Sequence, residues 1–150
     1  MARKLTGEDR GYFAALIDGE GCIRIGRFKN KNGDLRYRAY CHVAMTAKGP
    51  IRWLAQTIGG KIYIDRRPNY NKPVYCWQIN AKTAAKNLKK ILHLLRVKRK
   101  QATILRQFAA TLAGPGGSGE PRPVSKSMLQ FRRKLWRRNR NLNKKAKRTV

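Results

Sequence analysis

The stretch FAALIDGEG, residues 13–21, decides the interpretation of this chain, because within it the pattern of a helix gives way to the pattern of a strand. Upstream of it, Thr6 and Asp9 have the spacing of a capping box, so we expect a helix to begin near Thr6. Gly19 and Gly21 are expected to end that helix, because glycine tolerates the left-handed backbone of a helix exit. The apolar side of the helix follows helical spacing and comprises Tyr12, Phe13, Leu16 and Ile17.

Two acidic residues, Asp18 and Glu20, lie where the helix is expected to meet the strand. The glycines beside them would let a metal ion or a phosphate approach the backbone closely. Magnesium prefers oxygen ligands and usually takes one or two carboxylates together with phosphate oxygens of the substrate. Asp-Gly is also common in turns, so the pair taken alone is more readily explained as a cap or a turn.

The rest of the hydrophobic pattern predicts two pairs of strands separated by a helix and followed by further helices. Alternation of apolar and polar residues predicts strands at 22–28, 36–46, 61–65 and 74–80. Helical spacing predicts helices at 50–58, with Pro50 in its first position, at 84–95 and at 104–112. The core is expected to take Ile62, Ile64, Tyr75, Trp77 and Ile79, with Cys76 and Gln78 facing outward. The predicted order αββαββαα indicates an α+β domain.

The composition indicates the class of partner. The 150 residues include 36 lysines and arginines against 7 acidic residues, a net charge of +29. Nucleic acid is the polyanion that such a charge favours, with an anionic membrane surface as the alternative. No apolar run approaches the length of a membrane-spanning helix, and the N-terminus has no signal-peptide pattern. We therefore expect an intracellular nucleic-acid-binding protein with no membrane partner.

The residue types present argue against several kinds of catalytic site. The sequence has two histidines and no CxxC spacing, so a zinc site is not expected. Its three cysteines, Cys22, Cys41 and Cys76, lack paired spacing, which indicates a reducing compartment. No glycine-rich nucleotide-binding motif occurs. A hard-metal site would therefore have to come from the few acidic residues.

The chain divides at a segment that is rich in glycine and proline. We expect a core domain at residues 1–113 and a linker at 114–123, GPGGSGEPRP, because its residues do not support regular structure. Residues 124–150 are expected to form a basic amphipathic helical tail, in which apolar residues recur at helical spacing. Such a tail would add nonspecific DNA affinity, or would clamp flanking duplex or the body of the protein.

FAALIDGEG resembles the nine-residue signature of the LAGLIDADG homing endonucleases. Leu16, Ile17, Asp18 and Gly21 match it letter for letter, and Ala14 matches its second position. The resemblance extends to the order αββαββα and to LLRVKRKQA, residues 94–102, which is similar to the basic segment after the third core helix. It covers about residues 5–113 and leaves the tail outside.

The resemblance implies the αββαββα homing-endonuclease core, with a four-stranded antiparallel DNA-binding sheet, an extra C-terminal helix and the basic tail. It implies a site-specific double-strand DNA endonuclease that hydrolyses phosphodiesters with Mg²⁺, for which Mn²⁺ or Ca²⁺ could substitute in binding. Because the sequence contains one signature, a homodimer on a pseudo-palindromic target is implied. The dimer interface would include Tyr12, Ala14, Ala15 and Asp18.

The catalytic residues that the resemblance implies are Glu20, Lys98 and Asp18. Glu20 would bind the divalent metal, with the carbonyl of Gly19 as an added ligand. Asp18 matches the sixth signature position and is expected to be mainly a local structural acid. Lys98 would lie near the scissile phosphate, where it would stabilise charge or help to activate water; a solvated basic turn is the alternative. No residue is assigned to position the attacking water.

The polar face of the strands would read DNA, since a twisted antiparallel sheet can present alternate side chains to the major groove. A solvated surface is the alternative for each residue, and about half are expected to touch DNA, many at phosphates. The candidates are Arg24, Phe28, Asn30, Arg38, Tyr40, His42, Arg66, Arg67, Asn69, Lys72 and Gln78, with Arg96, Arg99 and Lys100 as phosphate contacts.

Two alternatives remain open on the same fold. An RNA-binding maturase would bind intron RNA tightly without metal-dependent DNA cleavage. A catalytically silent DNA-binding protein would bind specifically and would not nick DNA in magnesium or manganese.

Overall fold

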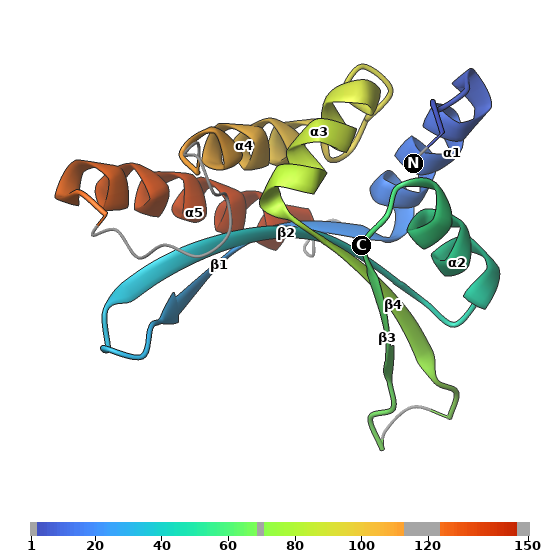
Figure 1. The fold of residues 1–150 in the computed structure, drawn as a ribbon, viewed down its shortest axis with the longest axis horizontal. Helices are drawn as coiled ribbons and strands as arrows, with labels where there is room; N and C mark the ends of the chain where they lie inside the picture. The colour runs from blue at the N-terminus through green and yellow to red at the C-terminus, as the bar shows by residue number, and fades with distance from the viewer. Residues whose placement is uncertain (1–2, 69–70, 113–123, 147–150) are drawn as a thin grey trace.

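The computed structural model describes residues 3–68, 71–112 and 124–146, with side chains of the last helix described as far as residue 144. Helices and strands follow one another in the order that the sequence predicts, with the tail as one further helix (Figure 1). They are α1 (Gly7–Glu20), β1 (Gly21–Lys29), β2 (Leu35–Met45), α2 (Lys48–Thr57), β3 (Lys61–Asp65), β4 (Val74–Asn80), α3 (Ala81–Ile91), α4 (Arg99–Ala110) and α5 (Lys126–Ala146). The predicted α+β class and four-stranded antiparallel sheet are confirmed.

The sheet is a curved layer with helices on one side. Its strand order is β1-β2-β4-β3, and every neighbouring pair is antiparallel. The helices cover its convex face, and the concave face is left bare (Figure 1). Because side chains alternate along a strand, Cys41 and Val43 on β2 are buried under the helices while Tyr40 and His42 face the bare side and are only half-buried.

The core lies between the sheet and the helices. Its largest fully buried side chains include Phe13 of α1, Trp77 of β4 and Phe108 of α4. The rings of Phe13 and Trp77 meet edge to face at 6.2 Å. The indole nitrogen of Trp77 donates to the carbonyl of Gly59 over 2.6 Å, which satisfies its polar group inside the core.

The junction between α1 and β1 differs from the prediction. The capping box of Thr6 and Asp9 is present as expected. The helix, however, leaves Glu20 directly into an extended strand, and Gly21 has φ −79° and ψ 152°. A Cβ at Gly21 would lie 2.6 Å from the carbonyl oxygen of Ile17. Glycine is therefore needed here because the helix backbone passes so close, and not for a left-handed turn.

The exposure of three strand residues also differs from the prediction. Ile62 and Ile64 were expected in the core but are 43% and 44% exposed. They belong to β3, an edge strand whose hairpin with β4 extends beyond the helices (Figure 1). Cys76 faces outward on the bare side of the sheet as expected, in register with Tyr63, but it is buried there.

The tail helix α5 packs onto the core. Leu135 and Asn139 are buried, and Asn139 bonds to the free edge of β1. Its side-chain oxygen accepts from the amide of Ile25, and its nitrogen donates to the carbonyl of Ile23, both over 3.0 Å. Asn139 thus makes the hydrogen bonds that a further strand would make. The structure shows α5 as part of the helix layer, and the division of the chain at residues 114–123 lies outside the described residues.

Among the described residues, no helix combines the length and the apolar character that crossing a bilayer requires.

Candidate active site and nucleic-acid interface

Asp18, in the last turn of α1, holds the loop that leads into α4. Its two carboxylate oxygens accept hydrogen bonds from three consecutive backbone amides, those of Arg96 (2.8 Å), Val97 (3.2 Å) and Lys98 (3.0 Å). Hydrogen bonds between a carboxylate and backbone amides are stronger than neutral ones. This geometry fits the prediction that Asp18 is mainly a structural acid.

Lys98 makes the reciprocal contact. Its ammonium donates to the carbonyls of Ile17 and Asp18, each over 2.9 Å. No basic residue lies in the last turn of α1, so Lys98 supplies the positive charge that the carbonyl end of a helix favours. Burial lowers the pKa of Lys98, and the negative charge of Asp18 opposes that shift. Lys98 is therefore held against the C-terminal end of α1, where the predicted metal ligand Glu20 also lies.

Glu20, the last residue of α1, is exposed. Within the described part of the chain its carboxylate has no hydrogen-bond partner, so it is free to take a ligand. The negative charge of Glu20, like that of Asp18, opposes the lowering of the Lys98 pKa that burial causes. The backbone of Gly19, also exposed, lies beside it.

A single chain does not build a complete cation site. Among the described residues, no group of three or more His, Cys, Asp or Glu side chains could hold a metal ion. Glu20 provides one exposed carboxylate, which suits a hard cation but leaves most coordination positions to other donors. A second copy of the chain, substrate oxygens or water would have to supply them.

The exposed side of α1 is a row of very small residues. Gly7, Gly11, Ala15 and Gly19 recur at every fourth position and are exposed. A Cβ at any of the three glycines would meet nothing within 4 Å in this chain. Another helix could therefore approach α1 closely along this row.

The predicted interface residues are distributed over different sides of α1. Ala15 lies on the exposed row, whereas Ala14 is 4% exposed and packs in the core of its own chain. Tyr12 is exposed at its edge, and its ring packs on Trp53 of α2 at 4.7 Å. The carboxylate of Asp18 is engaged with the loop before α4. We therefore retain Ala15 and Tyr12 as interface candidates and remove Ala14, because its own core covers it.

The bare face of the sheet collects most of the strand residues predicted to read DNA. A row of registered positions crosses all four strands: Cys22 pairs with His42, His42 with Gln78, and Gln78 with Lys61. The next pair is Arg24 with Tyr40. Because Cys22 follows Glu20 by two residues, this row begins beside the exposed carboxylate.

Aromatic rings and cations are interleaved on this face. Tyr40 and His42 stack at 5.8 Å. The guanidinium of Arg38 lies 5.3 Å from the ring of Phe28. Burial lowers the pKa of His42, with the charge of Arg24 as a further cause, and the Nδ1 atom of His42 is buried without a hydrogen-bond partner in the described structure.

The remaining candidates lie in loops. Asn30 uses its amide inside the β1–β2 turn, where it accepts from the backbone of Asn32 and Asp34. Arg67 is paired with Asp65 at the end of β3. Arg66 and Lys72 are exposed in the β3–β4 hairpin, and Asn69 lies outside the described residues.

The basic residues around the start of α4 have different surroundings. Arg96 is exposed beside Asp18. The guanidinium of Arg99 donates to the carbonyls of Leu92, His93 and Leu95, so it caps the end of α3. Lys100 lies on the outer side of α4. Neither Arg99 nor Lys100 belongs to the sheet face.

The sequence candidates did not include all residues of the bare face, and Lys61 and Tyr63 were missing. Lys61 pairs with Gln78, and Tyr63 pairs with Cys76, so both share the face with His42. Both are exposed. The alternation in KIYID contained this signal, because it places Lys61 and Tyr63 opposite the two isoleucines.

Solved structures share this fold. The homing endonuclease I-CvuI, in complex with its DNA target and calcium, matches with a TM-score of 0.70 and 20% identity, covering 90% of this chain and 82% of that one. The archaeal intron-encoded homing endonuclease I-Vdi141I, complexed with DNA, matches with a TM-score of 0.74 and 15% identity, covering 90% and 84%. The LAGLIDADG homing endonuclease I-GzeII, with its DNA target, matches with a TM-score of 0.64 and 16% identity, covering 85% and 43%.

The sequence itself points to the same family. Comparison with curated proteins gives no match. The family model described as LAGLIDADG endonuclease, by contrast, matches residues 13–110, which run from the signature stretch to the end of α4 and make up more than half of the chain. The chain therefore belongs to the LAGLIDADG endonuclease family.

Proposed function

We propose that the protein is a homing endonuclease that binds a specific DNA duplex on the concave sheet face and hydrolyses both strands as a homodimer. The observation that carries this proposal is the position of Glu20. This exposed carboxylate ends the signature helix and lies two residues before the row of polar side chains that crosses the sheet. A nuclease needs such an arrangement, in which a metal-binding acid adjoins the surface that holds the phosphodiester.

The basic and polar side chains of the sheet would provide both affinity and selectivity. Arginine and glutamine can contact guanine and adenine edges in the major groove, and further cations can fix the register on phosphates. Arg24, Arg38, His42 and Gln78 are the candidates on the strands. The similar structures of I-Vdi141I and I-GzeII are complexes with DNA, which supports duplex DNA as the partner.

The homodimer is supported by the incomplete site and by the row of small residues on α1. One copy supplies one Glu20, and two copies related by a two-fold axis would bring two carboxylates together. The exposed row at Gly11, Ala15 and Gly19 would let the two helices approach at short distance. The chain also covers only 43% of I-GzeII, so that protein has room for two such units.

The metal proposed for this site is Mg²⁺, with Glu20 as its protein ligand and the carbonyl of Gly19 as a further donor. Oxygen ligands of this kind suit a hard cation. When bound, such an ion lowers the pKa of water and stabilises charge on the attacking and leaving oxygens. Glu20 would hold the ion, the Asp18–Lys98 contacts would fix the direction of Glu20, and the sheet would hold the duplex. The three cysteines lack paired spacing in the sequence, which fits the proposed intracellular location.

Selection of cleaved sites from a random duplex library in magnesium tests this function. We expect recovery of one long, roughly palindromic sequence by the natural protein. The matched control is Glu20→Gln, which should bind the recovered sequence without cutting it. Specific binding with no cleavage by the natural protein in magnesium or manganese would reject the endonuclease and favour a silent DNA-binding protein.

A further inference from the structure

The outer side of the helix layer is strongly basic. α3, α4 and α5 contain many lysines and arginines and no aspartate or glutamate. Most of these cations are exposed; Arg132 is the buried exception and Arg106 is half-buried. No carboxylate on these three helices neutralises this positive charge. The surface therefore favours a polyanion as its partner.

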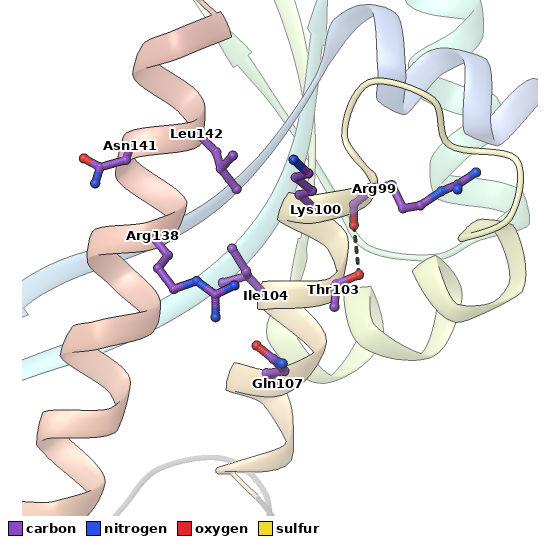
Figure 2. A pocket seen from close by; sticks show the side chains of 8 residues that line it. All are labelled: Arg99, Lys100, Thr103, Ile104, Gln107, Arg138, Asn141 and Leu142. Atoms are coloured by element: carbon purple, nitrogen blue, oxygen red, sulfur yellow. Dashed lines mark hydrogen bonds between the residues drawn. The ribbon is translucent and has the colours of Figure 1, made fainter.

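A cavity of about 520 Å³ lies between α4 and α5 on this surface (Figure 2). Ile104 and Leu142 contribute its apolar part, and Figure 2 shows Arg138 extending from α5 toward α4. The polar lining residues are Arg99, Lys100, Thr103, Gln107 and Asn141. Cations beside a small apolar surface match the two parts of a nucleic-acid backbone, the phosphate and the sugar.

This cavity is separate from the DNA-binding face proposed above. The sides of α4 and α5 that point to the sheet hold buried residues, among them Leu105, Phe108 and Leu135. The exposed lining residues of the cavity therefore lie on the other side of the helix layer from the concave sheet face (Figure 1). Bending a short duplex by 40–90° already costs on the order of 1–6 kcal/mol, so the duplex on the sheet would not also turn back to cover this side.

The exposed row along α5 suits a straight duplex. Arg133, Arg137, Asn141 and Lys144 follow each other at three- or four-residue spacing and are exposed. From Arg133 to Lys144 the row runs for about 17 Å along the helix. This length equals roughly five base pairs along a duplex. A line of cations on this scale can contact successive phosphates.

We propose that the outer face of α4 and α5 is a second DNA-binding site, which holds the backbone of a second duplex segment without reading its sequence. Lys100 and Arg138 would contact phosphates at the cavity, and Arg133 and Arg137 would continue the contacts along α5. Its occupant is a second segment of duplex DNA. A protein that holds two segments would raise the local concentration of DNA around the target site. The site goes beyond target cleavage, and its test does not require cleavage.

A bridging experiment with the full chain tests this site. A duplex carrying the target sequence is fixed to beads, the protein is added without magnesium, and capture of a labelled, unrelated DNA duplex is measured. Wild type should capture the second duplex, and capture should weaken steeply with salt. The double variant Arg137→Gln/Arg138→Gln should capture roughly tenfold less, since two backbone contacts are lost. Its binding to the first duplex should be unchanged.

The matched control is Lys4→Glu, which changes the net charge by the same two units at an exposed position outside the helix layer. It should bridge as wild type does. The proposal is wrong if wild type binds the first duplex and captures no second one, or if the double variant captures as much as wild type. Capture of a labelled RNA duplex in place of DNA would identify an RNA site and would also overturn it. In each case, if the protein still binds the first duplex, the result contradicts only the second site and not the proposed DNA binding by the sheet face.

Discussion

Asp18 and Lys98 hold the end of α1 and the start of α4 together by contacts that run in both directions. The carboxylate of Asp18 accepts from the backbone amide of Lys98 over 3.0 Å, and the ammonium of Lys98 donates to the backbone carbonyl of Asp18 over 2.9 Å. The two residues are 80 positions apart in the sequence. Glu20 follows Asp18 by two residues, so this contact anchors the helix end that carries Glu20.

Asp18→Asn should destabilise the fold. An amide keeps the size of the side chain but replaces one acceptor oxygen by a donor, which leaves a backbone amide of residues 96–98 without its partner. We expect the free energy of unfolding to fall by about 1–3 kcal/mol, measured by urea denaturation. Glu8→Gln, at an exposed position of the same helix, should change it by less than about 0.5 kcal/mol. Equal effects of the two variants would show that the Asp18 contacts add no stability.

Glu20→Gln should remove cleavage and leave DNA affinity largely intact. The side chain is exposed and is not part of the core, so the change removes a metal-binding charge without disturbing packing. Plasmid linearisation in magnesium measures cleavage, and fluorescence anisotropy with a labelled duplex measures affinity. Glu8→Gln serves again as the control and should cleave as wild type does. A parallel loss of affinity and cleavage in Glu20→Gln would contradict the metal role.

Gly11→Leu should prevent dimer formation while the chain still folds. A Cβ at Gly11 meets nothing within 4 Å in the chain itself. Leucine also forms a helix more readily than glycine, by up to about 1 kcal/mol, so the substitution should not unfold the chain. Between two α1 helices, however, the added side chain would separate the backbones. Light scattering should report a monomer, and cleavage should be lost. Gly49→Leu, also with open space around its Cβ position, should remain dimeric, and a dimeric Gly11→Leu would place the interface elsewhere.

Asn139→Leu should destabilise the protein although leucine fits the apolar surroundings in size. The change leaves the amide of Ile25 without its partner at the edge of β1, and it removes one of the two side-chain hydrogen bonds to the carbonyl of Ile23, to which Asn143 still donates. An unpaired buried backbone group costs about 1–3 kcal/mol, so the midpoint of urea denaturation should fall clearly. Asn141→Leu, exposed on the same helix, is the control and should have little effect. If both variants behaved alike, the contact of Asn139 with β1 would not be important for stability.

The sequence predicts most of the fold because the signals for it are local. The capping box at Thr6, the alternation in β2 and the helical spacing in α4 are each contained in one element. The family resemblance, carried by the signature stretch and by the basic segment 94–102, also identifies Glu20, Asp18 and Lys98 as one neighbourhood. The structure brings Asp18 and Lys98 into contact, and the metal-binding and catalytic roles stay predictions.

Features that depend on distant pairing could not be predicted. Asn139 bonds to residues more than 110 positions away. From the sequence alone, an asparagine in a basic helix is predicted to be solvated. Arg132, which donates to the hydroxyl and the carbonyl of Thr111, reads the same way and is buried. The exposure of Ile62 and Ile64 follows from the edge position of β3, which is a property of the topology and not of the local pattern. We therefore expect removal of α5 to destabilise the core as well as to weaken DNA binding.

The pH dependence of stability should contain a contribution from His42. Burial lowers the pKa of His42 below its usual value of 6.5. Above pH 6.5 the side chain is neutral in both the folded and the unfolded chain, so it contributes nothing. As the pH falls from 6.5 through the lower pKa of the folded state, the unfolded chain binds a proton first, and the folded state loses stability. Below the folded pKa the loss is complete and stays constant.

His42→Gln should remove this contribution. Urea denaturation between pH 8 and pH 5, about the range in which histidine titrates, should show a wild-type stability that falls relative to the variant as the solution becomes acidic. His93→Gln, at an exposed position after α3, should follow wild type. Parallel curves for wild type and His42→Gln would mean that the side chain takes up its proton as easily in the folded chain as in the unfolded one. His42 would then be well solvated on the bare sheet face, and its unpartnered Nδ1 would not mark a desolvated position beside the proposed DNA.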